Sequence, residues 1–376
     1  MTTAKIKKFD SRNSSIELLK IISIILIIFS HSVPFYGIGN EVWYIDCNIT
    51  TTDIQLLIIK FIRIFGQIGN VIFIACSSYF LIDSNKIKAN KILNIIINSW
   101  IISVIYLIIC FLLKYEVSIT ESIKQLFPII FKNNWFIGCY LLLYLFHPFL
   151  NIIIQAVSKQ TLFYINIFFV IIYGIIYFVL HNDIYYTELL GFIIIYFLVA
   201  FSKKYMHGFN QNIKLNKIIV IITVILHIFS ILFTNYIGLF ITPLANKVEH
   251  WNSLVNPLYI VFSICIINIC NNKKIINKKI NYISSLSIFV YLISENCLFK
   301  SKFFPKLFEY IYNNFNYNYK LLIIFIVGVI STIIFYTISM IYKETIAKKI
   351  ELFSTKIEQS MTYVFKNINK EIDKIK

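Results

Sequence analysis

Three ionisable side chains lie at or within the first apolar stretch of the chain: Glu17, Lys20 and His31. On a helix, the eleven residues from Lys20 to His31 span about 16 Å with about 20° of net rotation, so the two side chains share one face. Ionisable groups within a membrane span are costly, which makes them candidate site residues. A neutral histidine can accept a proton from a hydroxyl group. The alternatives are that His31 is a packing residue and that Lys20 is an interface anchor.

Two further charged residues fall within apolar stretches, Arg63 and Glu295. A bare charge is expensive inside a membrane, so each side chain needs an opposite charge or a wet cavity. Two interpretations stand: Arg63 and Glu295 line a functional site, or they form a structural ion pair.

Composition determines the class of protein. Of the 376 residues, 58% are apolar and only 14% are charged, whereas soluble domains carry about 25% charged residues. An ordinary soluble protein is therefore excluded, and the prediction is an all-α, polytopic integral membrane protein. The seven cysteines are scattered singly and no His, Cys or carboxylate cluster has ligand spacing, so no metal site is expected.

The apolar stretches predict about ten spanning helices, each about 20 residues long. They lie at residues 18–36, 56–82, 92–113, 135–157, 162–180, 186–202, 218–236, 253–270, 282–299 and 321–342. Because ten is even, both termini are expected on one side of the membrane.

The distribution of basic residues predicts that both termini are cytoplasmic. With the N-terminus inside, the inside segments, counted with Lys20 at the cytoplasmic interface, hold 25 of the 35 Lys and Arg residues, as cytoplasmic loops usually do. The net charge of +17 is thus a topology signal and requires no nucleic-acid partner.

The chain is expected to divide into a membrane-spanning domain, residues 1–342, and a basic cytoplasmic tail, residues 343–376. Apolar residues recur along the tail at helical spacing, with lysines between them. They are Ile346, Ile350, Phe353, Ile357, Met361, Val364 and Ile368. This pattern predicts an amphipathic helix on the inner leaflet, with a short coiled coil as the alternative.

Five short motifs follow one another along the chain. The first is a basic residue, Lys20, followed by ten residues and His31. The later ones are Phe65-Gly-Gln-Ile-Gly69 with Ser77-Ser-Tyr79-Phe80-Leu81, Asn134-Trp135-Phe136, Trp251-Asn252-Ser253, and Tyr291-Leu292-Ile293-Ser294-Glu295-Asn296. In this order they resemble the opening and the second, fourth, eighth and ninth spans of the acyltransferase family 3 membrane proteins. The resemblance covers about residues 12–342.

This resemblance implies a multi-pass enzyme of the bacterial inner membrane, an O-acetyltransferase. Such a protein moves an acyl group, usually acetyl, from cytoplasmic acyl-CoA to a hydroxyl of a surface glycan or its lipid-linked precursor. No cofactor beyond the co-substrate is expected. His31 and Glu295 would be catalytic. The expected substrate-binding residues are Glu17, Lys20, Arg63, Asn134, Trp135, Ser294 and Asn296.

The sequence departs from the family pattern at two positions. Ser294 stands where the ninth-span motif commonly has His, and Ser78 stands where the second-span motif usually has Gly. If the missing histidine is needed for proton transfer, activity is lost, whereas a serine can replace a residue that only orients its neighbours.

Two other functions fit the same charged residues. A transporter or flippase for a lipid-linked sugar could use His31, Arg63 and Glu295 as substrate or proton sites, and it favours paired repeats with broken helices. An inactive, purely structural membrane protein is the third interpretation. For the enzyme, direct transfer and relay through an acyl-enzyme both remain open.

Overall fold

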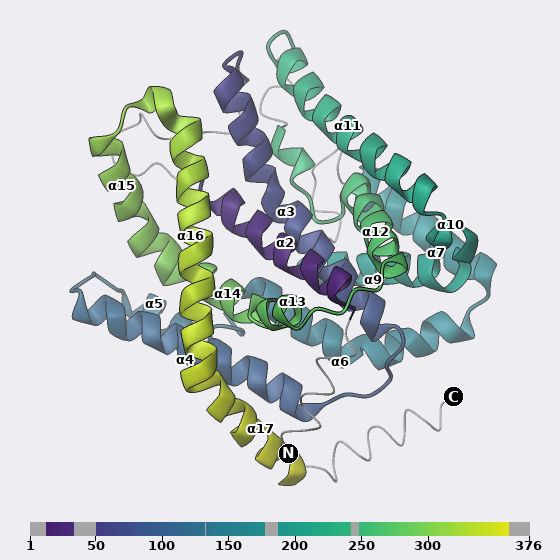
Figure 1. Ribbon diagram of the computed structural model, residues 1–376, viewed down its shortest axis with the longest axis horizontal. Helices are drawn as coiled ribbons and strands as arrows, with labels where there is room; N and C mark the ends of the chain where they lie inside the picture. The colour runs from purple at the N-terminus through teal and green to yellow at the C-terminus, as the bar shows by residue number, and fades with distance from the viewer. Residues whose placement is uncertain (1–12, 34–49, 132, 177–186, 242–247, 361–376) are drawn as a thin grey trace. The chain divides into compact units, whose positions relative to one another are not determined.

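The computed structural model describes residues 13–33, 50–131, 133–176, 187–241 and 248–360 (Figure 1). Within these ranges the regular structure is helical and contains no strand. The predicted all-α fold class is therefore confirmed.

The described part of the chain forms α-helices of very different length. They are α2 (Ser14–His31), α3 (Ile54–Leu81), α4 (Ala89–Leu112), α5 (Ile119–Leu126), α6 (Trp135–Ala156), α7 (Lys159–Phe169), α9 (Glu188–Tyr205), α10 (His207–Gln211), α11 (Ile213–Gly238), α12 (Pro257–Asn272), α13 (Lys278–Ser284), α14 (Ser287–Ser294), α15 (Phe304–Asn314), α16 (Lys320–Tyr342) and α17 (Lys348–Ser360). Short π or 3-10 segments are η2 (Val170–Ile176), η4 (Val248–Trp251), η5 (Phe299–Phe303), η6 (Tyr317–Tyr319) and η7 (Lys343–Ala347).

In the described part of the chain, 7 helices are long and apolar enough to cross a membrane. One bent pair would make an eighth: α13 and α14 together with η5 and α15. The other two predicted spans fall on α9, whose ends carry Glu188, Lys203 and Lys204, and on α12, which has only 16 residues. The protein is thus a multi-pass membrane protein, and the number of ten spans stays a prediction.

The predicted ninth span, 282–299, is a broken helix rather than a continuous one. The chain bends by 57° between Ser294 and Phe299. Two polar residues, Glu295 and Asn296, occupy the break. The mostly apolar residues of α14 before them give no sequence signal of a bend.

The described residues form two compact units, each with its own core. The first comprises residues within 1–80, 157–285 and 315–332, and the second comprises residues within 81–156, 286–314 and 333–376. Helix α16 begins in the first unit and ends in the second.

In the first unit, α2 packs closely against α3 because α3 has glycines at the crossing. A Cβ atom on Gly69 would meet the Ser23 carbonyl oxygen and would lie 2.9 Å from Cγ1 of Ile27. A Cβ atom on Gly66 would meet the Ser30 side chain. Small residues allow such close approach of helices in membranes, which explains the two glycines of the second-span motif.

In the second unit, α17 continues the chain from α16 and packs against α4. Ile350 is buried and Phe353 is 56% exposed, although the predicted amphipathic pattern groups them on one apolar face. Residues Met361, Val364 and Ile368 lie outside the described residues. The division at residues 342 and 343 stays a prediction.

Candidate active site

The start of α2 holds an ion pair made of Glu17 and Lys20. Asn13 caps the helix by accepting the Ser15 N–H at 3.1 Å. Nζ of Lys20 lies 3.4 Å from Oε1 of Glu17, and the Glu17 carboxylate also accepts a hydrogen bond from Ser284. Glu17 is only 5% exposed, so these bonds offset part of the cost of removing its carboxylate from water.

The chain between α12 and α13 is tied to the same end of α2. The Ser14 N–H donates to the Ile275 carbonyl at 2.8 Å, and the Ser14 hydroxyl donates to Oδ1 of Asn281 at 2.8 Å. The Ser15 hydroxyl donates to the Lys273 carbonyl at 2.6 Å. These bonds hold α13 beside α2 and so bring Ser284 to Glu17.

The end of α3 places two aromatic rings beside two lysines. Nζ of Lys20 lies 5.1 Å from the centroid of Phe80, and Nζ of Lys203 lies 4.0 Å from the centroid of Tyr79. Lys203 also donates to the Tyr79 carbonyl at 2.5 Å. Such cation–ring contacts keep two positive charges at this end of the unit.

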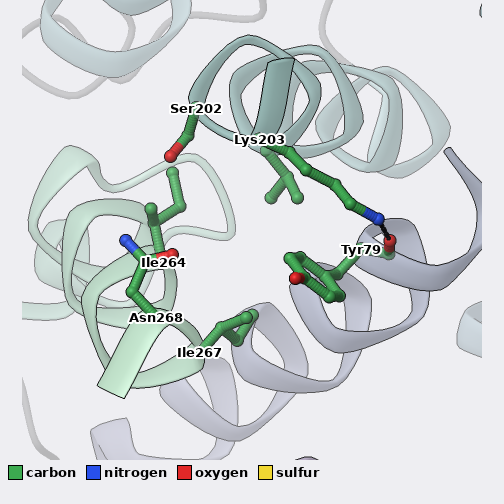
Figure 2. A pocket seen from close by; sticks show the side chains of 7 residues that line it. Tyr79, Ser202, Lys203, Ile264, Ile267 and Asn268 are labelled. Carbon is green, nitrogen blue, oxygen red and sulfur yellow. Dashed lines mark hydrogen bonds between the residues drawn. The ribbon is translucent and has the colours of Figure 1, made fainter. Parts of the chain in front are cut away.

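A small pocket lies next to Lys203, and its walls include the Tyr79 ring, the Lys203 side chain and the Asn268 amide (Figure 2). It is lined by Tyr79, Val199, Ser202, Lys203, Ile264, Ile267 and Asn268. Asn210 joins two of these walls, because its Oδ1 accepts from the Ser202 hydroxyl at 2.9 Å and from Nδ2 of Asn268 at 3.0 Å.

His31 is the last residue of α2 and is half-buried. Helix α2 is continuous from Ser14, so Lys20 and His31 stand about 16 Å apart along one axis. An apolar cluster that includes Val33, Ile59 and Ile324 packs beside this end of the helix. The structure thus places the predicted cation and the predicted base on one helix, three turns apart.

Arg63 lies on α3 toward the same end of α2 as His31. Gly69 packs at Ser23 and Ile27, and Gly66 packs at Ser30, so α3 runs opposite to α2. Arg63 lies one further turn along α3, at the level where α2 ends.

A second cation of α3, Lys60, is a buried residue that the sequence motifs did not single out. It is 1% exposed, and its Nζ donates to Oδ1 of Asn235 at 2.8 Å. Asn235 in turn receives the Thr51 N–H at 3.1 Å. The only sequence signal was a lysine within an apolar run.

Before α3, Asp53 pairs with the first residue of α16. Nζ of Lys320 lies 2.8 Å from Oδ2 of Asp53. The hydrogen bond from Lys320 holds the pKa of Asp53 below its ordinary value. This pair ties the start of α3 to the start of α16.

Glu295 lies in the second unit, at the end of α14. Its N–H donates to the Tyr291 carbonyl at 2.9 Å, and its Oε2 lies 2.5 Å from Nζ of Lys300. Arg63 belongs to the first unit. A pairing of Arg63 with Glu295, and a single site shared by His31 and Glu295, therefore stay predictions.

The other predicted site residues of the second unit are Asn134, Trp135, Ser294 and Asn296, of which all but the half-buried Trp135 are buried. Nδ2 of Asn134 donates to the Ser99 hydroxyl at 2.8 Å, just before Trp135 begins α6. Ser294 is 5% exposed and its hydroxyl lies 3.5 Å from the Tyr291 carbonyl oxygen. Asn296 contacts Gln125, a residue that no motif indicated.

The described residues contain no group of three or more His, Cys, Asp and Glu side chains that could hold a metal ion.

Taken together, the helices define a multi-pass membrane protein whose helix α2 carries an ion pair near its start and a histidine at its end. A family model described as an acyltransferase domain matches residues 13–340, nearly the whole chain. The chain belongs to acyltransferase family 3 and is a membrane acyltransferase, as the sequence resemblance predicted. No curated protein and no solved structure matches it.

Proposed function

We propose that this protein is an O-acyltransferase of the bacterial inner membrane, which transfers acetyl from cytoplasmic acetyl-CoA to a hydroxyl of a surface glycan or its lipid-linked precursor. The observation that carries the proposal is the arrangement on α2, where Lys20 and His31 lie on one continuous helix. Acyl-CoA is a long donor with phosphates at one end and a thioester at the other. A cation and a base three turns apart suit such a donor.

The ion pair at the start of α2 supports a donor end at Lys20. Glu17 holds the Lys20 ammonium at 3.4 Å, and Phe80 lies beneath it. Lys203, over the neighbouring ring of Tyr79, adds a second positive charge. Phosphates form charge-assisted hydrogen bonds with such ammonium groups.

In the direct mechanism, a neutral His31 accepts the proton of the acceptor hydroxyl as that oxygen attacks the thioester carbonyl carbon. The new ester C–O bond forms, the C–S bond breaks, and the CoA thiolate leaves and takes up the proton. In the relay mechanism the acyl group first joins an enzyme side chain. Both mechanisms require His31 near the acyl group.

The remaining predicted residues have supporting roles in this proposal. Arg63, at the level of the end of α2, would stabilise the oxyanion or an acceptor phosphate. Glu295 would bind or orient the acceptor hydroxyl, assisted by Asn134, Trp135, Ser294 and Asn296. Ser294, in place of the usual histidine, would orient its neighbours rather than move a proton.

One observation favours the alternative of a transporter for a lipid-linked sugar. The segment from α13 to α15 is bent by 57° at a break, and broken helices are typical of transporter sites. The described residues contain one such bent pair, whereas the inverted repeats of transporters usually supply two.

Mass spectrometry of surface glycans distinguishes the two functions. We compare cells with the wild-type gene, a deletion, His31→Ala and the control His207→Ala, which changes an exposed histidine of α10. The proposal predicts loss of base-labile acetyl mass in the deletion and in His31→Ala only. Normal acetylation in the deletion, with less glycan at the surface, would instead establish transport.

A further inference from the structure

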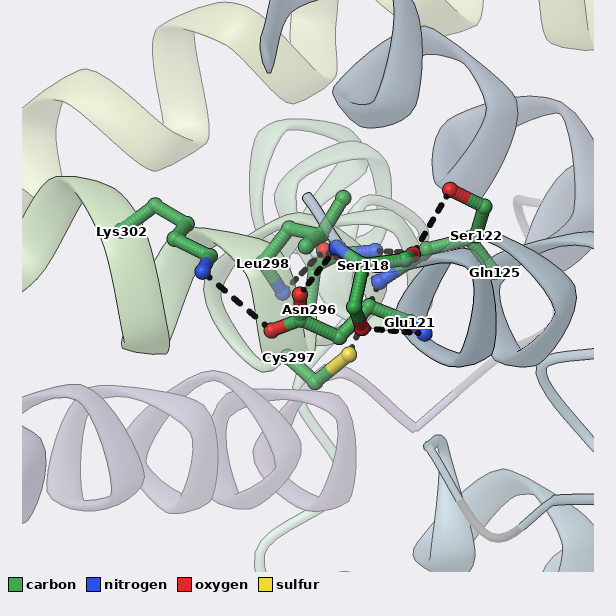
Figure 3. A network of polar contacts seen from close by, with 8 residues as sticks. All are labelled: Ser118, Glu121, Ser122, Gln125, Asn296, Cys297, Leu298 and Lys302. Atoms are coloured by element: carbon green, nitrogen blue, oxygen red, sulfur yellow. Dashed lines mark hydrogen bonds and ion pairs between the residues drawn. The ribbon is translucent and has the colours of Figure 1, made fainter. Parts of the chain in front are cut away.

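Helix α5 is a short polar helix with one buried side chain, Gln125 (Figure 3). Gln125 is 0% exposed, while its neighbours Lys124 and Leu126 are exposed. A capping box starts the helix, with Glu121 accepting the Ser118 N–H at 2.8 Å. That bond holds the pKa of Glu121 below its ordinary value.

Gln125 forms a reciprocal amide pair with Asn296. Nδ2 of Asn296 donates to Oε1 of Gln125 at 3.2 Å, and Nε2 of Gln125 lies 3.4 Å from Oδ1 of Asn296. Nε2 also donates to Sγ of Cys297 at 2.8 Å. Both amides are buried, so losing one partner leaves the other unsatisfied.

Asn296 in turn sets the path of the chain through the break in the ninth span. Its Oδ1 accepts the N–H of Leu298 at 3.0 Å and the N–H of Phe299 at 3.4 Å. Irregular backbone at membrane depth needs such partners within the protein. Gln125 is therefore the side chain by which α5 contacts the residue that shapes the break.

The bend also sets the surroundings of Glu295. This residue ends α14 on one side of the break, and its partner Lys300 lies on the other side, in η5, at 2.5 Å. A change in the bend would shift Lys300 relative to the Glu295 carboxylate.

We propose that Gln125 is a positioning residue for acyl transfer, which fixes the break through Asn296 and so orients the Glu295 carboxylate. This inference rests on the role that the proposed function gives to Glu295. Positioning errors of about 1 Å at a site can lower rates by about a hundredfold.

Kinetics of the purified full-length protein, with acetyl-CoA as donor, test the inference. Gln125→Ala and Gln125→Met, the second filling the space without an amide, should each lower kcat about tenfold or more and leave the KM for the donor unchanged. The control is Glu121→Gln. It can keep the capping box and removes only the partly exposed pair with Lys302 at 3.3 Å, so kcat should stay within about twofold of wild type.

A double-variant comparison separates positioning from a merely structural role. If Gln125 acts through Glu295, adding Gln125→Ala to Glu295→Gln should cost no further activity. If instead the losses in kcat of the two single variants add up in the double variant, the inference is overturned. It is also overturned if Gln125→Met keeps the wild-type kcat while Glu295→Gln has a lowered kcat. Full activity in Glu295→Gln would overturn both this inference and the proposed role of Glu295. The proposed function would still be tested separately, because His31→Ala decides whether the protein transfers acyl groups.

Discussion

At the residue scale, Lys20 has two interpretations that kinetics can separate. If its ammonium binds the donor phosphates, Lys20→Ala should raise the KM for acetyl-CoA about tenfold, because a charge-assisted hydrogen bond contributes about 1.5 kcal/mol. Lys20→Arg should restore part of the affinity. The control is Lys217→Ala, which changes an exposed lysine of α11. An unchanged KM in Lys20→Ala would show that the residue is an interface anchor.

The buried Glu17 carboxylate supports a second prediction at this scale. Ser284→Ala removes the hydroxyl that donates to Glu17 and should lower the free energy of unfolding by about 1–3 kcal/mol. Ser285→Ala removes a bond to the uncharged Tyr282 carbonyl, not to a buried carboxylate, and should cost clearly less. Thermal unfolding in detergent measures both variants. Equal stabilities would mean that Ser284 does not support the carboxylate.

Some of these residues were predictable and others were not. Lys20 and His31 could be placed on one face of a helix because helical geometry follows from their spacing. Lys60 and Gln125 could not be singled out, since their roles depend on Asn235 and Asn296, far away in the sequence. Hydrogen bonds between distant amides leave no local pattern.

At the element scale, the crossing of α2 and α3 depends on Gly69. Gly69→Ala should lower the free energy of unfolding by about 1–3 kcal/mol, because the added methyl group overpacks the contact with Ser23 and Ile27. The control is Gly138→Ala in α6, where the nearest atom would be Cγ2 of Ile129 at an ordinary 3.7 Å. Thermal unfolding of the two variants tests this, and equal stabilities would contradict the close crossing.

Apolar runs predicted where helices lie, but not where they break. Helix α3 spans Ile54–Leu81 against a predicted 56–82, because a long apolar run has one compatible structure in a membrane. The break at Glu295 and Asn296 escaped prediction because one of the partners that hold Asn296 in place, Gln125 on α5, is far away in the sequence. Helices α9 and α12 are not among the 7 helices that are long and apolar enough to cross a membrane. Helix α9 carries charged residues near its ends, and α12 has only 16 residues.

At the scale of the whole molecule, the distribution of lysines predicts the orientation of the chain. Reporter fusions that are active only outside the cytoplasm should be inactive at both termini, since the inside segments hold 25 of the 35 basic residues. A fusion within 114–134 should be active, because it falls in a predicted outer loop. Activity at one terminus only would mean an odd number of spans and would place the two ends on opposite sides.

The central claim is that His31 is required for acyl transfer from acyl-CoA, and release of CoA thiol by the purified protein tests it most directly. With acetyl-CoA and an acceptor glycan present, His31→Gln should release CoA at least about a hundredfold more slowly than wild type, the usual contribution of a general base. The control His207→Ala should match wild type. Wild-type rates of acceptor-dependent CoA release in His31→Gln would contradict the account.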